Sequence, residues 1–187
     1  RMSSVVDVAT RDGDFNGFHG SFMIGLIDGR LQFEGPIIKG KTSFNIALRR
    51  SWLDAVLAPT VAYLNKNNDD GEKIGGTYAF HDLNASIAHK FSDKDKLSLK
   101  FYYGRDRLKL SQTKPETFNY IVVDDERTEM TASGEDEINA DIAWGNLLTS
   151  LNWSHIFNEN MYLNAVAYYS GSNADVWYRW KDWRFSD

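Results

Sequence analysis

Apolar and polar residues alternate with a period of two along several stretches of this chain, a pattern that predicts β-strands. The clearest stretch is 97–103, where Leu97, Leu99 and Phe101 alternate with Ser98 and Lys100. Strands of this kind are expected at about 1–10, 17–27, 31–37, 44–49, 83–91, 97–103, 146–157 and 162–169. A helical turn or two is expected within 52–64. The pattern therefore predicts an all-β fold of antiparallel strands.

The connections between these strands differ in length according to their place in the order. Short charged turns are expected at 38–42, 92–96 and 158–160, and a further tight turn at Asp28-Gly29-Arg30. The polar stretches 53–76 and 108–141 are expected to be long loops, with 65–76 the plainest. Short turns at one end and long loops at the other are typical of a transmembrane β-barrel.

The predicted strands have one apolar and one polar face. Lys100 stands in the middle of its strand on the polar face, where a water-filled lumen suits its charge better than a dry core. A sheet of about seven such strands would leave two unpaired edges, which lipid cannot satisfy. We therefore expect the chain to be part of a larger barrel.

Composition fits this interpretation and excludes some others. The chain of 187 residues has no cysteine, so disulfides and cysteine-based metal sites are excluded. Aromatic residues make up 14% of it, and Trp and Tyr concentrate where membranes meet water. The net charge is −5 and no basic patch is visible, so nucleic acid is not an expected partner. No apolar run is long enough for a transmembrane helix, and Arg1-Met2-Ser3-Ser4 does not resemble a signal peptide.

Several segments, in this order, resemble TonB-dependent outer-membrane receptors of Bacteroidetes. Residues 1–13 resemble the last strand of the plug domain, and 34–44 resemble the first periplasmic turn of the barrel. Residues 91–97, and 144–146 together with 155–158, also match that pattern. The resemblance spans nearly the whole chain and is carried by the order and spacing of these segments together, while the Ton box, most of the plug and all later strands are missing.

The resemblance implies a domain division and a function. Residues 1–14 would be the end of the plug domain and its linker, and 15–187 the first strands of a plugged barrel of 22 strands. Such receptors lie in the outer membrane of Gram-negative bacteria and import a scarce siderophore, vitamin, glycan or peptide. Their partners are outer-membrane lipid, the TonB complex, the extracellular ligand and, in some members, a surface lipoprotein. No cofactor is implied.

A cluster of aromatic and basic residues near the end of the chain is the candidate ligand site. Its ligand-binding candidates are Trp177, Tyr178, Trp180 and Trp183. Alternation would place Trp177 and Trp183 on one face with Arg179 and Lys181, and Tyr178 and Trp180 on the other. The cluster can be read either as the outer aromatic girdle of a barrel or as a surface on which a sugar ring or aromatic ligand stacks.

No catalytic or metal site is predicted. His19, His81, His89 and His155 stand singly on different strands, without the spacing of metal ligands. No serine has a recognisable partner histidine and acid, so we do not expect an enzyme.

Two further protein classes fit the sequence. One is a complete small outer-membrane barrel of about eight strands with a structural or adhesive role. The other is a soluble carbohydrate-binding β-sandwich, which would have a dry inner face.

Overall fold

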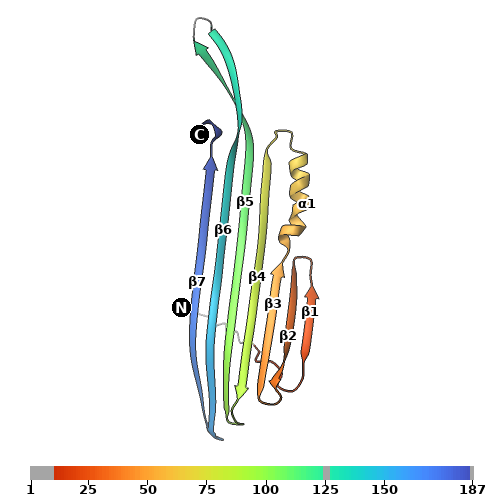
Figure 1. Ribbon diagram of the computed structural model, residues 1–187, viewed down its shortest axis with the longest axis vertical. Coiled ribbons are helices and arrows are strands. Elements are labelled where there is room, and N and C mark those ends of the chain that lie inside the picture. Colours follow the sequence, from red (N-terminus) through yellow and green to blue (C-terminus); the bar gives the residue numbers. More distant parts are fainter. Residues whose placement is uncertain (1–10, 124–126, 186–187) are drawn as a thin grey trace, which may run out of the picture. The chain divides into compact units, whose positions relative to one another are not determined.

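A computed structural model describes residues 11–123 and 127–185 (Figure 1). In chain order its elements are β1 (His19–Ile24), β2 (Asp28–Ile38), β3 (Thr42–Ser51), α1 (Leu53–Lys66), β4 (Lys73–Lys90), β5 (Asp95–Val123), β6 (Arg127–Asn158), β7 (Met161–Lys181) and the 3-10 helix η1 (Trp183–Phe185). The strands form one seven-stranded sheet in the order β1-β2-β3-β4-β5-β6-β7. The predicted antiparallel all-β fold is confirmed, whereas the strand expected over 1–10 lies outside the described residues.

The chain divides into two compact units. Among the described residues, the first contains 11–51, Phe80–Arg105 and Gly145–Asn173. The second contains Trp52–Ala79, 106–123, 127–144 and 174–185. This division differs in kind from the plug and barrel boundary expected at residue 14, which stays a prediction.

The strand register in the first unit gives the sheet an apolar and a polar side. Phe33 pairs with Ile46, and Ile46 with Ala85, whereas the neighbouring Glu34 pairs with Asn45 and Asn45 with Ser86. Directly paired residues project to the same side of an antiparallel sheet. One side is therefore lined by residues such as Phe22, Leu31, Phe33, Phe44, Ile46, Leu48, Leu83, Ile87, Leu99 and Phe101, and the other by Ser21, Gln32, Glu34, Asn45, Asn84, Ser86 and Lys100.

In a globular domain apolar side chains are buried and polar ones exposed, and in this sheet the two are reversed. Within the described residues, the only buried hydrophobic residues are Ala88 and Ala143. The buried polar residues are Asp28, Glu34, Thr42, Ser43, Ser51, Ser86 and Ser98. Large apolar side chains stay exposed, for example Phe22 at 78% and Leu99 at 47%. Apolar side chains normally form the core, so this sheet lacks an apolar core of its own.

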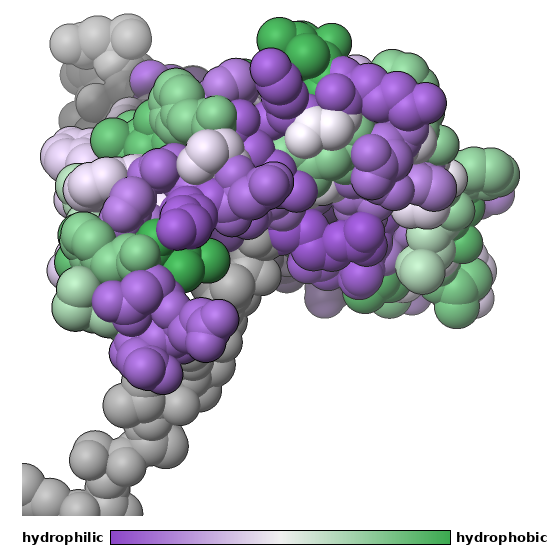
Figure 2. Space-filling view, turned by 90° about the horizontal axis from the view of Figure 1, so that it is seen from below, coloured by the Kyte–Doolittle hydropathy of each residue, from purple (hydrophilic) through white to green (hydrophobic). Residues whose placement is uncertain are grey.

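The three short turns of the first unit were predicted and are confirmed. Gly40, in the β2–β3 turn, has a φ of +75°, which favours glycine. In the β4–β5 turn the Ser92 hydroxyl accepts hydrogen bonds from the amides of Lys94 and Asp95. The β6–β7 turn is held by the Asn158 side chain, which accepts from the Asn160 amide. The end that carries these turns is largely hydrophilic, with hydrophobic residues mainly towards its sides (Figure 2).

The turn expected at Asp28-Gly29-Arg30 was placed too late in the sequence. The chain reverses at Gly25-Leu26-Ile27, where the Gly25 amide donates to the Asp28 carbonyl over 2.8 Å. Asp28 belongs to β2 instead, because its carboxylate accepts a hydrogen bond from Nε of Arg49 on β3 over 2.6 Å. That ion pair fixes Asp28 at the start of the strand.

The two long loops expected from the sequence are largely regular structure. The helical turns expected within 52–64 are confirmed as α1, and β4 already begins at Lys73. The stretch 108–141 is not a loop, because β5 continues to Val123 and β6 begins at Arg127. Both faces of this hairpin carry exposed residues, for example Phe118 on one face and Ile121 on the other, so the alternation that marks a half-buried strand is missing. No described helix is both long and apolar enough to cross a membrane.

Candidate functional site

The segment 11–15 lies across the polar side of the first unit and is bound there through its main chain. The carbonyl oxygen of Arg11 accepts a hydrogen bond from Oγ of Ser86 at 2.7 Å. That of Asp12 accepts from Oγ of Ser43 at 2.8 Å. That of Phe15 accepts from the Gly40 amide at 2.8 Å. Ser43 and Ser86 are buried for this reason, since the segment covers them.

Charged side chains of the segment pair with charges on the sheet. Nη2 of Arg11 lies 2.8 Å from Oε1 of Glu34, whose side chain is only 6% exposed. The Asp12 carboxylate forms an ion pair with Lys96, and its other oxygen lies 3.5 Å from Nζ of Lys100. A charge withdrawn from water is tolerated when it is paired. The charges of Glu34 and Lys100, each within a strand, are therefore balanced by the segment that covers them.

Gly13 allows the close approach of the segment to β3. Its φ is +88°, and a Cβ built on it would lie 2.7 Å from the carbonyl carbon of Phe44 and still closer to the carbonyl oxygen. A side chain cannot occupy that space without moving the backbone. Beside it, Nζ of Lys90 lies 4.2 Å from the ring centre of Phe15, a cation–π contact that holds the end of the segment.

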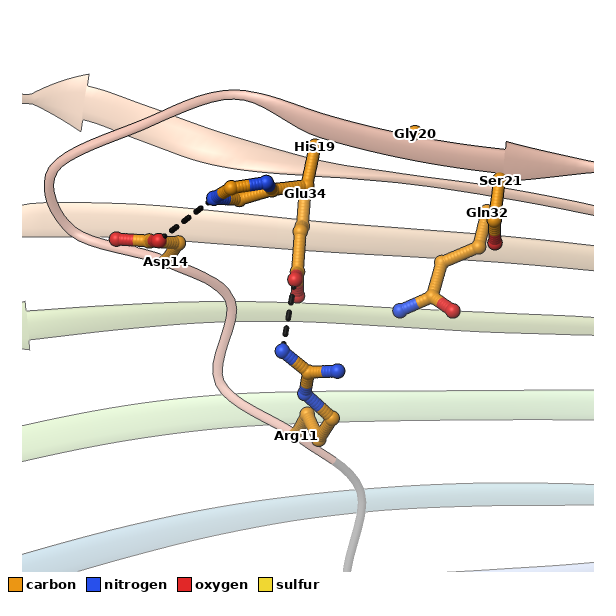
Figure 3. A pocket seen from close by; sticks show the side chains of 7 residues that line it. All are labelled: Arg11, Asp14, His19, Gly20, Ser21, Gln32 and Glu34. Carbon is orange, nitrogen blue, oxygen red and sulfur yellow. Dashed lines mark hydrogen bonds and ion pairs between the residues drawn. The ribbon is translucent and has the colours of Figure 1, made fainter.

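A solvent-open hollow of about 320 Å³ lies between the segment and the first two strands (Figure 3). It is lined by Arg11, Asp14, His19, Gly20, Ser21, Gln32 and Glu34. Nε2 of His19 lies 2.8 Å from Oδ2 of Asp14. The Asn16 amide and the His19 ring both hydrogen-bond the Asp14 carboxylate, which lowers the pKa of Asp14 below its ordinary value. The hollow offers donors and acceptors to a small polar molecule.

The aromatic residues predicted to bind a ligand do not form one surface. Trp177, Tyr178 and Trp180 lie on β7 and are 48%, 61% and 63% exposed. The guanidinium of Arg179 lies 5.0 Å from the ring centre of Trp177, so these two share a side of the strand. Tyr178 and Trp180 alternate to the other side. Ligand binding by these residues stays a prediction.

Trp183 is separated from the other three. It lies in η1, after β7 has ended at Lys181, so the alternation expected to extend to it stops first. Its amide donates to Oδ1 of Asp136 at 3.2 Å, and its ring lies against Gly134, where a Cβ would collide with it. Trp183 thus packs on β6.

The histidines were expected on four different strands, but His81 and His89 both lie on β4, while His19 is on β1 and His155 on β6. Nδ1 of His89 lies 2.8 Å from the Thr42 hydroxyl, His155 contacts Asp95, and the His81 ring lies tilted beside the ring of Tyr103. Over the described part of the chain, no three His, Asp or Glu residues come together as a metal site would require.

The anchored segment is the feature that sequence reasoning missed. Arg11-Asp12-Gly13-Asp14 could be read only as the end of a strand, because its partners Ser86 and Lys96 are 75 and 84 residues away. One available signal was Glu34, the only charged residue within the strand expected at 31–37. It indicated that a cation from elsewhere would reach this position.

The fold and the site together define a sheet with an uncovered apolar side and a polar side bound by its own N-terminal segment. Comparison of the chain with protein-family models, curated proteins and solved structures finds no match.

Proposed function

We propose that this chain forms part of the wall of an outer-membrane β-barrel transporter, a TonB-dependent receptor that imports a scarce extracellular siderophore, vitamin, glycan or peptide. The observation that carries this proposal is the reversed burial of the first unit. Exposed apolar side chains such as Leu99 and Ile87 suit contact with lipid, and buried polar ones such as Glu34 and Ser86 suit a hydrated lumen.

The lengths of the apolar stretches support a membrane wall. The apolar side of β3 lies within 42–50, and that of β7 within 161–169. A tilted strand crosses the hydrocarbon layer with about nine to eleven residues. These stretches are of that order, with Arg50 at the end of the first and Asp175 the first charged residue after the second.

The edges of the sheet support a larger barrel. β1 and β7 stand at the two ends of the strand order, so each has one unpaired edge within the described residues. Open edges are not tolerated in lipid, where no water can satisfy the backbone. Further strands, 22 in all by the resemblance, would pair with them.

The anchored segment supports the plugged lumen. In the proposal, residues 11–15 connect a plug to the wall, and the ion pairs of Arg11 and Asp12 hold that junction closed. The outer membrane has no ATP, so work must arrive through a mechanical link to the TonB complex of the inner membrane. A pull on the segment would have to break these ion pairs.

The ligand is proposed to meet the lumen side above the membrane. Tyr178 and Trp180 are even-numbered on β7, as is Asn164, which bonds to Ser154 on the polar side of the sheet. Both rings are exposed and can stack on a sugar or an aromatic ligand. A surface lipoprotein is a further proposed partner.

Spin-label accessibility tests the proposed orientation. The chain has no cysteine, so single cysteines can be placed at Leu151, Asn152, Leu163 and Asn164 and labelled in lipid bilayers. Labels at Leu151 and Leu163 should collide with dissolved oxygen more than with a water-soluble nickel chelate. Labels at Asn152 and Asn164 should show the opposite preference. Equal water accessibility at all four positions would contradict the proposal.

Uptake measurements separate the receptor from a small structural barrel. A receptor should lose ligand uptake in cells without a functional TonB complex, whereas an adhesive barrel should be unaffected. A soluble carbohydrate-binding sandwich would need a second sheet over the apolar side, and every strand of residues 11–123 and 127–185 belongs to one sheet.

A further inference from the structure

A groove of about 490 Å³ lies wholly within the second unit and combines two cationic side chains with an indole ring. Its lining includes Lys109, Ser111, Asn139, Asp141, Trp177 and Arg179. Asp141 is held by Arg107, whose Nε lies 2.8 Å from Oδ1. Among the described residues, neither Lys109 nor Arg179 forms an ion pair with a carboxylate. The free charge of the groove is therefore positive.

The groove has the chemistry that recognises a phosphorylated sugar. Arg179 lies over the Trp177 ring at 5.0 Å, which leaves its planar guanidinium oriented beside an exposed aromatic face. A guanidinium and an ammonium bind phosphate through charge-assisted hydrogen bonds. Ser111 and Asn139 can hydrogen-bond sugar hydroxyls or amides, and Trp177 presents a flat apolar surface for the ring.

The sequence of β5 and β7 favours a lipid headgroup as the source of this sugar. Odd-numbered residues of β5 are apolar from Leu97 to Tyr103 and then become Arg105, Arg107 and Lys109. Those of β7 are apolar over 163–169, pass through Gly171, Asn173 and Asp175, and then become Trp177, Arg179 and Lys181. Side chains with this spacing share one side of a strand. In the proposed barrel, the side that meets hydrocarbon continues into the layer of headgroups.

We propose that the groove binds the phosphorylated sugar headgroup of an outer-leaflet lipid. This inference rests on the proposed membrane orientation, and it assigns to Trp177 a role separate from ligand import. Lys109 and Arg179 would hold the phosphate, while Trp177 covers the sugar ring. Binding there would fix the height of the strands in the membrane.

Native mass spectrometry of the purified protein in nanodiscs tests the site. The probe is a diphosphorylated glucosamine-disaccharide lipid, compared with the same lipid without phosphates. We expect about tenfold or more weaker binding of the dephosphorylated lipid, and a similar loss for Lys109→Gln combined with Arg179→Gln. The matched control is Lys39→Gln with Lys94→Gln, which removes the same charge from exposed turns and should bind as the unchanged protein does.

Two outcomes overturn the proposal while leaving the barrel intact. Equal binding by both double variants would show that general charge, and no defined groove, attracts the lipid. Competition by free glucosamine 6-phosphate as strong as that by the lipid would assign the groove to a soluble sugar. Failure to insert, seen as loss of the spin-label pattern of the unchanged protein, would overturn the barrel and this site together.

Discussion

At the scale of single residues, a few positions decide how the N-terminal segment meets the sheet. Gly13 and Gly40 both have a positive φ, at +88° and +75°. A Cβ at Gly13 would collide with the backbone of Phe44 on β3, whereas nothing lies within 4 Å of a Cβ at Gly40. The two glycines therefore separate the cost of the backbone conformation from the cost of contact.

Substitution of these glycines tests the segment's anchoring. Gly40→Ala should lower the free energy of unfolding by about 1–2 kcal/mol, the cost of a left-handed backbone. Gly13→Ala carries the same cost and also collides with Phe44, so it should release residues 11–15 from β3. The measurement is urea unfolding in lipid together with the rate of protease cleavage within the segment. Equal cleavage of both variants would show that the segment is not held at Gly13.

At the scale of elements, the strands of the first unit have one apolar and one polar side. Leu99 is 47% exposed on the apolar side of β5, while its neighbour Lys100 lies 3.5 Å from Asp12 on the polar side. The sides differ in what covers them, since the anchored segment lies only on the polar one. A charged side chain is therefore expected to lower the stability of the protein at position 99 and to be tolerated at position 100.

Exchange of charge between these neighbours tests the assignment of faces. Leu99→Arg should destabilise the protein in a bilayer by about 2–4 kcal/mol if this position lies near the midplane. Lys100→Leu should cost less, because Asp12 keeps its ion pair with Lys96. Unfolding titrations in lipid vesicles measure both variants. The reverse ranking would mean that lipid covers the other side.

At the scale of the whole molecule, the missing apolar core is the main physical fact. Ala88 and Ala143 are the only hydrophobic residues buried within the described ranges, and the edges of β1 and β7 are open there. Exposed apolar surface of this extent marks an interaction site or an aggregation hazard. The protein needs something else, lipid in our proposal, to cover that surface.

Behaviour in solution tests this conclusion. In water without detergent, the 187-residue chain should associate or precipitate, since both its apolar side and its strand edges attract further copies. Detergent should restore a dispersed β-rich state, seen by circular dichroism and light scattering. A stable, monodisperse monomer in plain buffer would contradict the membrane assignment.

Much of the fold could be predicted from local patterns, and the exceptions have physical causes. The strand at 97–103 was found because each of its residues shows whether it faces apolar or polar surroundings. The hairpin of β5 and β6 beyond 108 was missed, because strands exposed on both sides show no such alternation. The Asp28 turn was misplaced, because the glycine after it suggested a tight turn while its ion pair with Arg49 could not be seen.

The aromatic site was predictable in part for the same reason. Alternation separated Trp177 from Tyr178 and Trp180, and the contact of Arg179 with Trp177 agrees with it. Trp183 could not be placed, because its packing on Gly134 depends on a contact between residues 49 positions apart in sequence. Sequence reasoning also gave no sign of the cationic groove, whose lining comes from four separate strands.

The sequence by itself determined the central parts of the strands, their antiparallel pairing, three of the short turns and the polarity of each side, because period-two alternation and turn residues act over a few positions. Tertiary structure decided which side is covered and by what. Arg11 meets Glu34, and Asp12 meets Lys96, only when distant segments fold together. Such pairings depend on the distance between the side chains in space and on how far their charges are withdrawn from water. Neither can be predicted from the local pattern of residues.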